Sequence, residues 1–190
     1  IHELLSGVKS ADVLRLPRRR LLDTLGHTFV CETATAVDTQ AGCVETATGR
    51  RFAFDACVVA VGGVNNTLGV RGAEQFSLPF KTVDDCVAIA QRLRERLNSG
   101  RKTSVVIIGA GLEGVEALGE ILRGYRNHAG LAVHLVEGGE RILPGRDPRL
   151  GEDIQQHCAD LPVTFHLGES VASLTKTRVK LVSGRSLPSD

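Results

Sequence analysis

A glycine-rich turn between a strand and a helix constrains the fold of this chain more than any other feature. The run Val105–Ile108 is apolar, and the glycines Gly109, Gly111 and Gly114 follow it at G-x-G-x-x-G spacing before an amphipathic helix. This strand, turn and helix order is the context in which the spacing predicts dinucleotide binding. Gly109 allows the tight turn, and Gly111 has no Cβ to hold a pyrophosphate away. Gly114 lets the helix pack closely on the strand.

An acidic residue at the end of the next strand strengthens this prediction. Glu137 closes the expected strand Leu131–Glu137, about 20 residues after the last glycine, where a carboxylate accepts the hydroxyls of an adenosine ribose. The pyrophosphate is expected on the N–H groups at the helix N-terminus, where the helix dipole favours negative charge. The residues predicted to bind the cofactor here are Gly109, Ala110, Gly111, Leu112, Gly114, Glu137 and Gly138.

The residues after Glu137 predict which nicotinamide nucleotide is bound. Gly138 and Gly139 have no side chain that could offset the charge of a 2′-phosphate, and Glu140 adds a further acid. Arg141 is the only nearby base, and it comes four positions after Glu137. We therefore expect NADH and not NADPH.

Hydrophobic periodicity predicts an α/β chain whose second part has a parallel sheet, because strands alternate with helices there. Helices are expected at Arg18–Leu25, Val83–Leu97, Leu112–Tyr125 and Asp147–Ala159. Strands are expected at His27–Glu32, Thr35–Asp38, Cys43–Thr46, Ser104–Ile108, Leu131–Glu137, Val163–Phe165, Ser170–Leu174 and Arg178–Val182. The apolar run from Asp55 to Val61, stopped by Gly62 and Gly63, predicts a buried strand, and Val64–Pro79 reads as a crossover loop. His134 is interpreted as a sheet histidine with a satisfied ring, and Glu113 as a solvent-facing partner of the helix dipole.

Composition excludes several classes of partner. Lys and Arg total 23 against 22 Asp and Glu, so no global charge draws the chain to nucleic acid or to an anionic membrane. The run Arg18–Arg20 is interpreted as the solvated face of a short helix. No apolar stretch approaches the roughly 20 residues that span a bilayer, and no secretory signal is recognisable, which favours a cytoplasmic location. The five cysteines form no C-x-x-C pair, so we expect buried, reduced thiols and no zinc site.

Several stretches together resemble a known family. Phe54–Gly62, Asn66–Gly72 and Leu78–Thr82, followed by the fingerprint with Gly114-Val115-Glu116, resemble the two-dinucleotide flavoproteins, and among them the type II NADH dehydrogenases are the most similar. The resemblance implies two Rossmann-like domains that bind FAD and NADH, with hydride passing from NADH to the flavin and on to a quinone. Ala60–Gly62 resembles the family's A-T-G motif, with Val61 in place of the threonine.

The resemblance also implies where the chain lies in such a protein. The fingerprint at Gly109 is then the second of two, and neither the first, FAD-binding one nor the later Gly-Asp motif is present, so we expect a central segment. Residues 1–80 are expected to be a partial FAD-binding domain with a short β-meander and the crossover, and residues 81–190 a Rossmann-like NADH-binding domain. Gly62 is expected near FAD, and Glu116 is implied as the catalytic residue on the nicotinamide side.

Further expectations follow for the partners, and two other functions stay open. The unpaired apolar surface before Gly62 predicts self-association into a homo-oligomer, and attachment to the periphery of a membrane would depend on parts outside this segment. One alternative is a non-catalytic, redox-sensing NADH-binding module. The other is a flavoprotein reductase for a ferredoxin-type carrier. The lack of C-x-x-C beside the fingerprint argues against the low-molecular-weight thioredoxin reductases, but redox cysteines in an N-terminal part stay possible.

Overall fold

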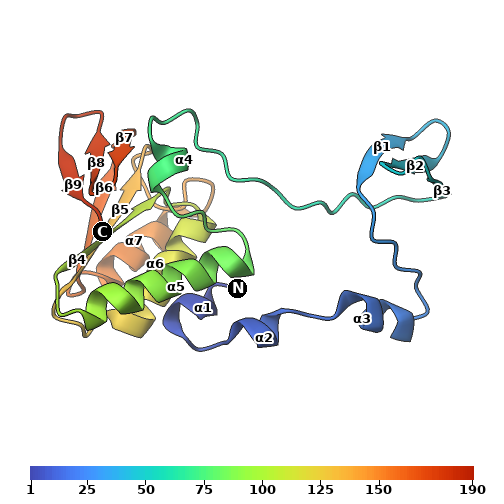
Figure 1. The fold of residues 1–190 in the computed structure, drawn as a ribbon. Coiled ribbons are helices and arrows are strands. Elements are labelled where there is room, and N and C mark those ends of the chain that lie inside the picture. The colour runs from blue at the N-terminus through green and yellow to red at the C-terminus, as the bar shows by residue number, and fades with distance from the viewer. The chain divides into compact units, whose positions relative to one another are not determined.

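The computed structural model describes residues 1–190, which form two compact units. The larger unit combines Ile1–Arg15 with Asn65–Asp190, and the smaller unit is Leu16–Val64 (Figure 1). This division differs from a boundary near residue 80, because the first fifteen residues pack with the second part of the chain. The assignment of residues 1–80 to an FAD-binding domain stays a prediction.

A parallel three-stranded sheet lies at the centre of the larger unit. Its strands are β4 (Thr103–Ile108), β5 (Leu131–Glu137) and β6 (Val163–Leu167), in the order β4-β5-β6. The strands are linked by α6 (Leu112–Tyr125) and α7 (Pro148–His157), and α5 (Val83–Asn98) precedes them. The predicted parallel α/β arrangement is confirmed, and the bounds of α6 and β5 agree with the prediction.

The helices bury their apolar stripes against one face of this sheet. In α5 the buried residues are Cys86, Ala90, Leu93 and Leu97. Two short helices, α1 (Glu3–Ser6) and α2 (Ala11–Leu14), were not predicted, and Leu4 and Leu5 of α1 join the same core. Gly124 of α6 makes room for α1, since a Cβ there would lie 3.0 Å from the Cα of Ser6. None of the helices has the length and apolarity that crossing a lipid bilayer requires.

An antiparallel meander covers the other face of the parallel sheet (Figure 1). It consists of β7 (Val171–Thr175), β8 (Arg178–Leu181) and β9 (Ser186–Pro188). Leu174, Val179, Leu181 and Leu187 pack there against Val136 of β5. The larger unit therefore has three layers: helices, parallel sheet and meander. The sequence pattern missed β9, the last and shortest strand of this layer.

The expected loop Val64–Pro79 contains a short helix, α4 (Ala73–Phe76), that docks on the meander. Arg71 forms a parallel β-bridge with Ser173. Gly72 is needed at this contact, because its φ is 81° and a Cβ would lie 2.3 Å from the carbonyl oxygen of Leu174. The segment is therefore bound to β7 and is not a free loop.

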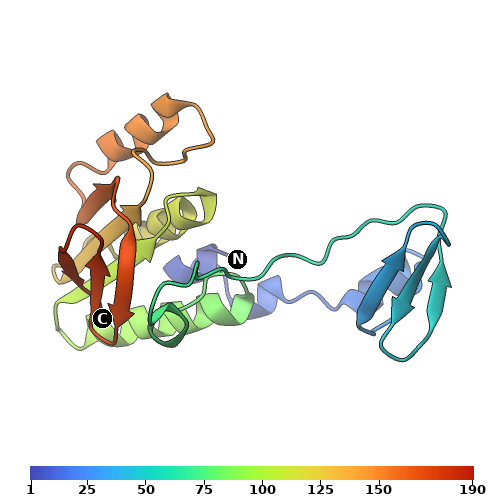
Figure 2. The same ribbon diagram turned by 90° about the horizontal axis from the view of Figure 1, so that it is seen from above.

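The smaller unit contains the predicted β-meander, whose strands appear as blue to teal arrows in Figure 2. The unit comprises α3 (Arg18–Thr24), β1 (Ala34–Asp38), β2 (Cys43–Thr46) and β3 (Arg51–Ala53), and its three strands pair antiparallel. Strands were predicted at the positions of β1 and β2, whereas β3 was not predicted. The strand predicted at His27–Glu32 is absent. The antiparallel pairing of β1 with β2 ends at the hydrogen bond from the N–H of Ala47 to the carbonyl oxygen of Thr33. The residues before Thr33 therefore have no partner strand.

The strand predicted from Asp55 to Val61 is also absent. This segment is extended and exposed, with Val58 90% and Val61 85% exposed. Its composition favours a strand, but a strand requires a neighbour to accept and donate its backbone hydrogen bonds, and the chain supplies none. The prediction that five cysteines are buried is wrong for two of them, since Cys31 and Cys57 are exposed.

Candidate nucleotide-binding site

The three fingerprint glycines have distinct structural roles in the turn between β4 and α6. Gly109 has a φ of 100°, in the left-handed region that favours glycine, and its N–H donates to the carbonyl oxygen of Val136. A Cβ on Gly114 would lie 1.9 Å from the carbonyl oxygen of Gly109, so no other residue fits there. A Cβ on Gly111 would meet nothing within 4 Å. Two glycines close the turn, and Gly111 leaves open space above it.

The N-terminus of α6 is not capped by a side chain. Gly111 is the N-cap, and the first helical hydrogen bond runs from the N–H of Val115 to its carbonyl oxygen. By helix geometry, the N–H groups of Leu112, Glu113 and Gly114 have no acceptor within the helix. Uncapped donors and the positive end of the helix dipole favour an anion at this position.

Glu137 is held directly beside this turn. Its Oε2 accepts a hydrogen bond of 2.7 Å from the N–H of Ala110, and its Oε1 accepts one of 2.8 Å from the N–H of Gly139. Each carboxylate oxygen keeps a lone pair for a further donor such as a hydroxyl. Ala110 is fully buried, so its side chain is turned away from solvent. A Cβ on Gly138 would lie 3.1 Å from Oγ of Ser170, which explains the small residue there.

The loop after Glu137 contains a strained residue that the sequence does not reveal. Leu143 has a φ of 52°, a conformation that costs a non-glycine residue about 1–3 kcal/mol. Its N–H donates to the carbonyl oxygen of Ala110, and its carbonyl oxygen accepts from the N–H of Arg146. Its side chain is buried. The loop is thereby fastened to the glycine turn, and no pattern of residue types announces this contact.

Glu116 lies on the exposed side of α6, one turn beyond the glycines. Its Oε2 is 2.9 Å from Nε2 of His2, and the His2 ring lies against Phe80 with 5.4 Å between ring centroids. Glu113 is exposed, as expected, and its Oε1 is 2.7 Å from Nζ of Lys81. Sequence patterns missed both basic partners, because each comes from a segment remote in sequence from α6.

Gly62 is the one predicted cofactor-binding residue outside this arrangement. It belongs to the smaller unit, within the exposed segment that follows β3, and its φ is 73°. The other seven predicted cofactor-binding residues lie between β4 and the loop after β5 in the larger unit. The structure therefore brings the seven residues predicted to bind NADH together, and Gly62 stays a separate prediction.

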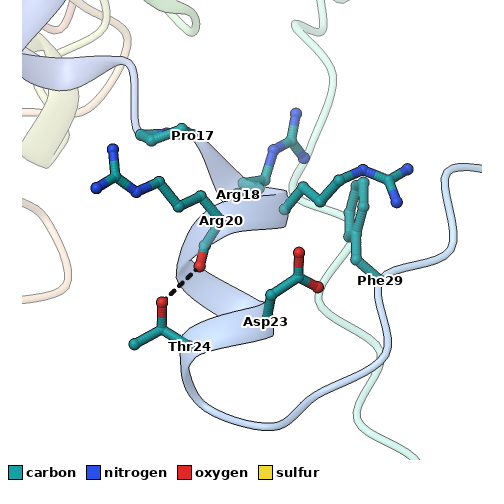
Figure 3. A pocket seen from close by; sticks show the side chains of 7 residues that line it. Pro17, Arg18, Arg20, Asp23, Thr24 and Phe29 are labelled. Atoms are coloured by element: carbon teal, nitrogen blue, oxygen red, sulfur yellow. Dashed lines mark hydrogen bonds between the residues drawn. The ribbon is translucent and has the colours of Figure 1, made fainter.

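The smaller unit has a shallow hollow of its own, which carries no sign of a nucleotide site (Figure 3). Its lining residues are Pro17, Arg18, Arg19, Arg20, Asp23, Thr24 and Phe29. The guanidinium of Arg19 lies 5.4 Å from the centroid of the Phe29 ring, and all three arginines are exposed. They form the solvated helix face that the sequence predicts.

Comparison with known proteins places these features in a family. The family model for pyridine nucleotide-disulphide oxidoreductases matches residues 5–190. An NADH dehydrogenase-like protein of Mycobacterium tuberculosis is 32% identical, covering 91% of this chain and 46% of the relative. A type II NADH:quinone oxidoreductase of Staphylococcus saprophyticus is 26% identical, covering 91% of this chain and 47% of the relative.

Among solved structures, NDH2 from Plasmodium falciparum in complex with NADH superposes with a TM-score of 0.79 at 18% identity, covering 99% of this chain and 45% of that one. The chain thus spans about half the length of these proteins. A family match over nearly the whole chain, together with the fingerprint turn and the layered fold, shows that the chain belongs to the pyridine nucleotide-disulphide oxidoreductases.

Proposed function

We propose that this chain is the NADH-binding segment of an FAD-dependent oxidoreductase. The observation that carries the proposal is the carboxylate of Glu137, held by the N–H of Ala110 beside the uncapped N-terminus of α6. An anion-binding helix end next to an acceptor for hydroxyl groups matches the pyrophosphate and ribose of a dinucleotide. The open space at Gly111 leaves room for the backbone to approach the pyrophosphate.

Family membership and the named relatives support the wider assignment. The matched relatives are described as NADH dehydrogenase-like and as a type II NADH:quinone oxidoreductase, and each is about twice as long as the matched segment. The chain is accordingly a central segment, in which residues 1–80 contribute to an FAD-binding domain near Gly62 and residues 81–190 bind NADH. The run from Asp55 to Val61, which is extended and unpaired in this structure, would become a strand if the rest of that domain supplied a partner.

The residues of this chain have separate roles in the proposed reaction. Bound NADH supplies a hydride to the flavin. The first N–H groups of α6 hold the pyrophosphate, and Glu137 accepts the ribose hydroxyls. Leu112, the first residue of α6, and Gly138, which follows Glu137, would contact the bound dinucleotide. Glu116, paired with His2, lies on the nicotinamide side, where its carboxylate orients the ring or holds a proton.

The electron acceptor and the location complete the proposal. The description of the staphylococcal relative favours a quinone. A quinone dissolved in lipid would require attachment to the periphery of the membrane, on its cytoplasmic side, through parts of the protein outside this segment. A soluble ferredoxin-type carrier is the competing acceptor, and a sensor that binds NADH without passing electrons is the competing function.

The decisive experiment uses the full-length protein with bound flavin, mixed with NADH in the absence of oxygen. Loss of the oxidised-flavin absorbance is expected, followed by recovery on addition of a quinone. A Cβ at position 111 would meet no atom within 4 Å, so Gly111→Val should fill the open space and abolish flavin reduction. Gly119→Ala, on the same helix and equally free of neighbours, is the matched control and should behave as wild type.

Each contrary result has a distinct meaning. Unchanged flavin reduction in Gly111→Val refutes the placement of the pyrophosphate. NADH binding without flavin reduction favours the sensor. Recovery of the flavin absorbance with an oxidised ferredoxin-type carrier, but not with a quinone, would make that carrier the electron acceptor.

A further inference from the structure

Two histidines meet between β5 and β6, under the antiparallel meander. His134 Nδ1 lies 3.1 Å from His166 Nε2, and the two rings are tilted by 41° with 5.2 Å between centroids. His166 is only 7% exposed and His134 is half-buried. Since one nitrogen must donate and the other accept, this hydrogen bond contains a single proton. The satisfied sheet histidine predicted at position 134 thus has another histidine as its partner.

The surroundings oppose charge on this pair. Burial lowers the pKa of His134, and neighbouring His166 lowers it further. Burial also lowers the pKa of His166, where the positive charge of Arg185 adds to the effect and Glu169 opposes it. Arg185 and Glu169 are themselves paired, with 2.7 Å between Nη2 and Oε1. From β4, the residue opposite His134 is Val106, which has no charge to offer.

The strands that carry the pair end at the proposed nucleotide site. Three residues beyond His166, the N–H of Glu169 donates a 2.9 Å hydrogen bond to the carbonyl oxygen of Glu137. The N–H of Gly168 donates to the carbonyl oxygen of Gly139. These two bonds fasten the end of β6 to the corner that presents the Glu137 carboxylate.

We propose that His134 and His166 form a proton-operated latch, which holds β6 against β5 when neutral and loosens the corner carrying Glu137 when the pair is fully protonated. With both rings charged, two N–H donors face each other across 3.1 Å with no acceptor between them. The hydrogen bond is then lost, and two like charges lie in a desolvated position. His134 and His166 act as positioning residues for Glu137 and do not touch the nucleotide. The effect on NADH rests on the proposed function.

The direction of the pH effect follows from the lowered pKa values. The unfolded chain takes up protons near the ordinary histidine pKa of about 6.5, while the folded chain takes them up at lower pH. Stability from the pair is therefore complete above that range and is lost as the pH falls through the folded-state values. For each extra proton that the unfolded state binds, the unfolding equilibrium constant rises about tenfold for every unit by which the pH falls.

The test measures denaturant unfolding of the full chain at several pH values between 7.5 and about 5. His166→Gln keeps a hydrogen-bonding group opposite His134 and cannot become charged. On acidification, the unfolding equilibrium constant should rise in both proteins. The rise in wild type should be at least about tenfold greater than the rise in His166→Gln. His27→Gln replaces an exposed histidine remote in sequence from the pair; it is the matched control and should follow wild type. Equal pH dependence in wild type and His166→Gln overturns the latch.

Two further readouts keep the proposal decidable. Histidine NMR resonances of the wild-type chain should show His134 and His166 titrating below the ordinary histidine pKa of about 6.5. Titration at that ordinary value overturns the latch even where His166→Gln fails to fold. NADH titrations at pH 7.5 and 5.5 should show weaker binding at the lower pH in wild type but much less weakening in His166→Gln. Absence of NADH binding at both pH values contradicts the proposed function alone, and the unfolding and NMR results still decide the latch.

Discussion

Glu137 combines two tasks in one side chain, because its carboxylate closes the glycine turn and also faces the proposed ribose. Replacing it by alanine should weaken NADH binding about tenfold or more, since each charge-assisted hydrogen bond contributes about 1.5–3 kcal/mol and 1.4 kcal/mol is a factor of ten. NADPH should bind the unaltered chain more weakly than NADH, because its 2′-phosphate would lie beside the carboxylate. Titration of both nucleotides measures this.

A control separates the two tasks of Glu137. Glu137→Gln retains one oxygen that can accept from the N–H of Ala110, but it removes the charge and the second acceptor, which faces the N–H of Gly139. It should retain the fold and still bind NADH more weakly than wild type. Equal affinity for NADH and NADPH in the unaltered protein, or unchanged NADH affinity in Glu137→Ala, would show that the ribose does not lie at Glu137.

Gly114 tolerates no side chain, because a Cβ there would lie 1.9 Å from a backbone oxygen that cannot move independently of the turn. Gly114→Ala should therefore destabilise the larger unit by at least the 1–3 kcal/mol typical of overpacking. Gly119→Ala, which meets nothing within 4 Å, should be neutral or slightly stabilising, as expected for alanine in a helix. Chemical unfolding followed by circular dichroism compares the two, and equal stability would contradict the steric argument.

For single residues, sequence patterns locate those whose type and spacing indicate a structural role. The three glycines and Glu137 come together as predicted, because their spacing reflects a local strand, turn and helix. Leu143 could not be predicted, since leucine seldom adopts a positive φ and long-range hydrogen bonds hold it there. The His134–His166 contact depends on strand register, which no local pattern specifies.

Helix α5 shows how a single element is stabilised at its start. Oγ1 of Thr82 accepts from the N–H of Asp85, and the Asp85 carboxylate accepts from the N–H of Thr82, which is a capping box. Thr82→Ala should cost about 1 kcal/mol of unfolding free energy. Arg92→Ala, at an exposed position of the same helix, should stay within about 0.5 kcal/mol of wild type. A loss of similar size in both variants would mean that the cap has no special role.

The elements differ in how far sequence patterns reveal them. Long amphipathic helices such as α5 and α6 were predicted almost to the residue, because their periodicity is local. The strands expected at His27–Glu32 and from Asp55 to Val61 do not form, because a strand exists only with a partner and the pattern does not show whether one is present. The short elements α1, α2, α4 and β9 depend on docking and leave too little periodicity to detect.

The whole molecule exposes an unusual apolar segment next to the β-meander of the smaller unit. Val58 and Val61 are 90% and 85% exposed. Unpaired, β-branched segments of this kind associate with one another, so the 190-residue chain should self-associate in a concentration-dependent way. Replacing both valines by lysine should shift the chain towards monomer in sedimentation experiments. Val182→Lys, at an isolated exposed valine, should not, and a wild-type monomer at high concentration would contradict the prediction.

The whole chain also allows a prediction about its flavin content, and hence its colour. It has a single glycine fingerprint, which is assigned to NADH, and the exposed segment around Gly62 offers no enclosed cradle for a second dinucleotide. The isolated 190-residue chain should therefore purify colourless and still bind NADH. Absorbance and mass spectrometry of the native chain measure this. Stoichiometric flavin in the purified chain would show that residues 1–80 are sufficient for FAD.

Two hydrogen bonds join Ser104 at the start of β4 to Asp190, which is remote in sequence, so the larger unit cannot complete its fold before Asp190 has been synthesised. The N–H of Asp190 donates to the carbonyl oxygen of Ser104, and the N–H of Ser104 donates to the Asp190 carboxylate. A ribosome adding about 5–20 residues per second needs on the order of 1 to 4 s to extend the chain from Leu167, where β6 ends, to Pro188, where β9 ends. During that time one face of the nascent parallel sheet has no meander to cover it. Completion of this unit is therefore a late, non-local folding event, and chaperones have seconds in which to bind the uncovered face.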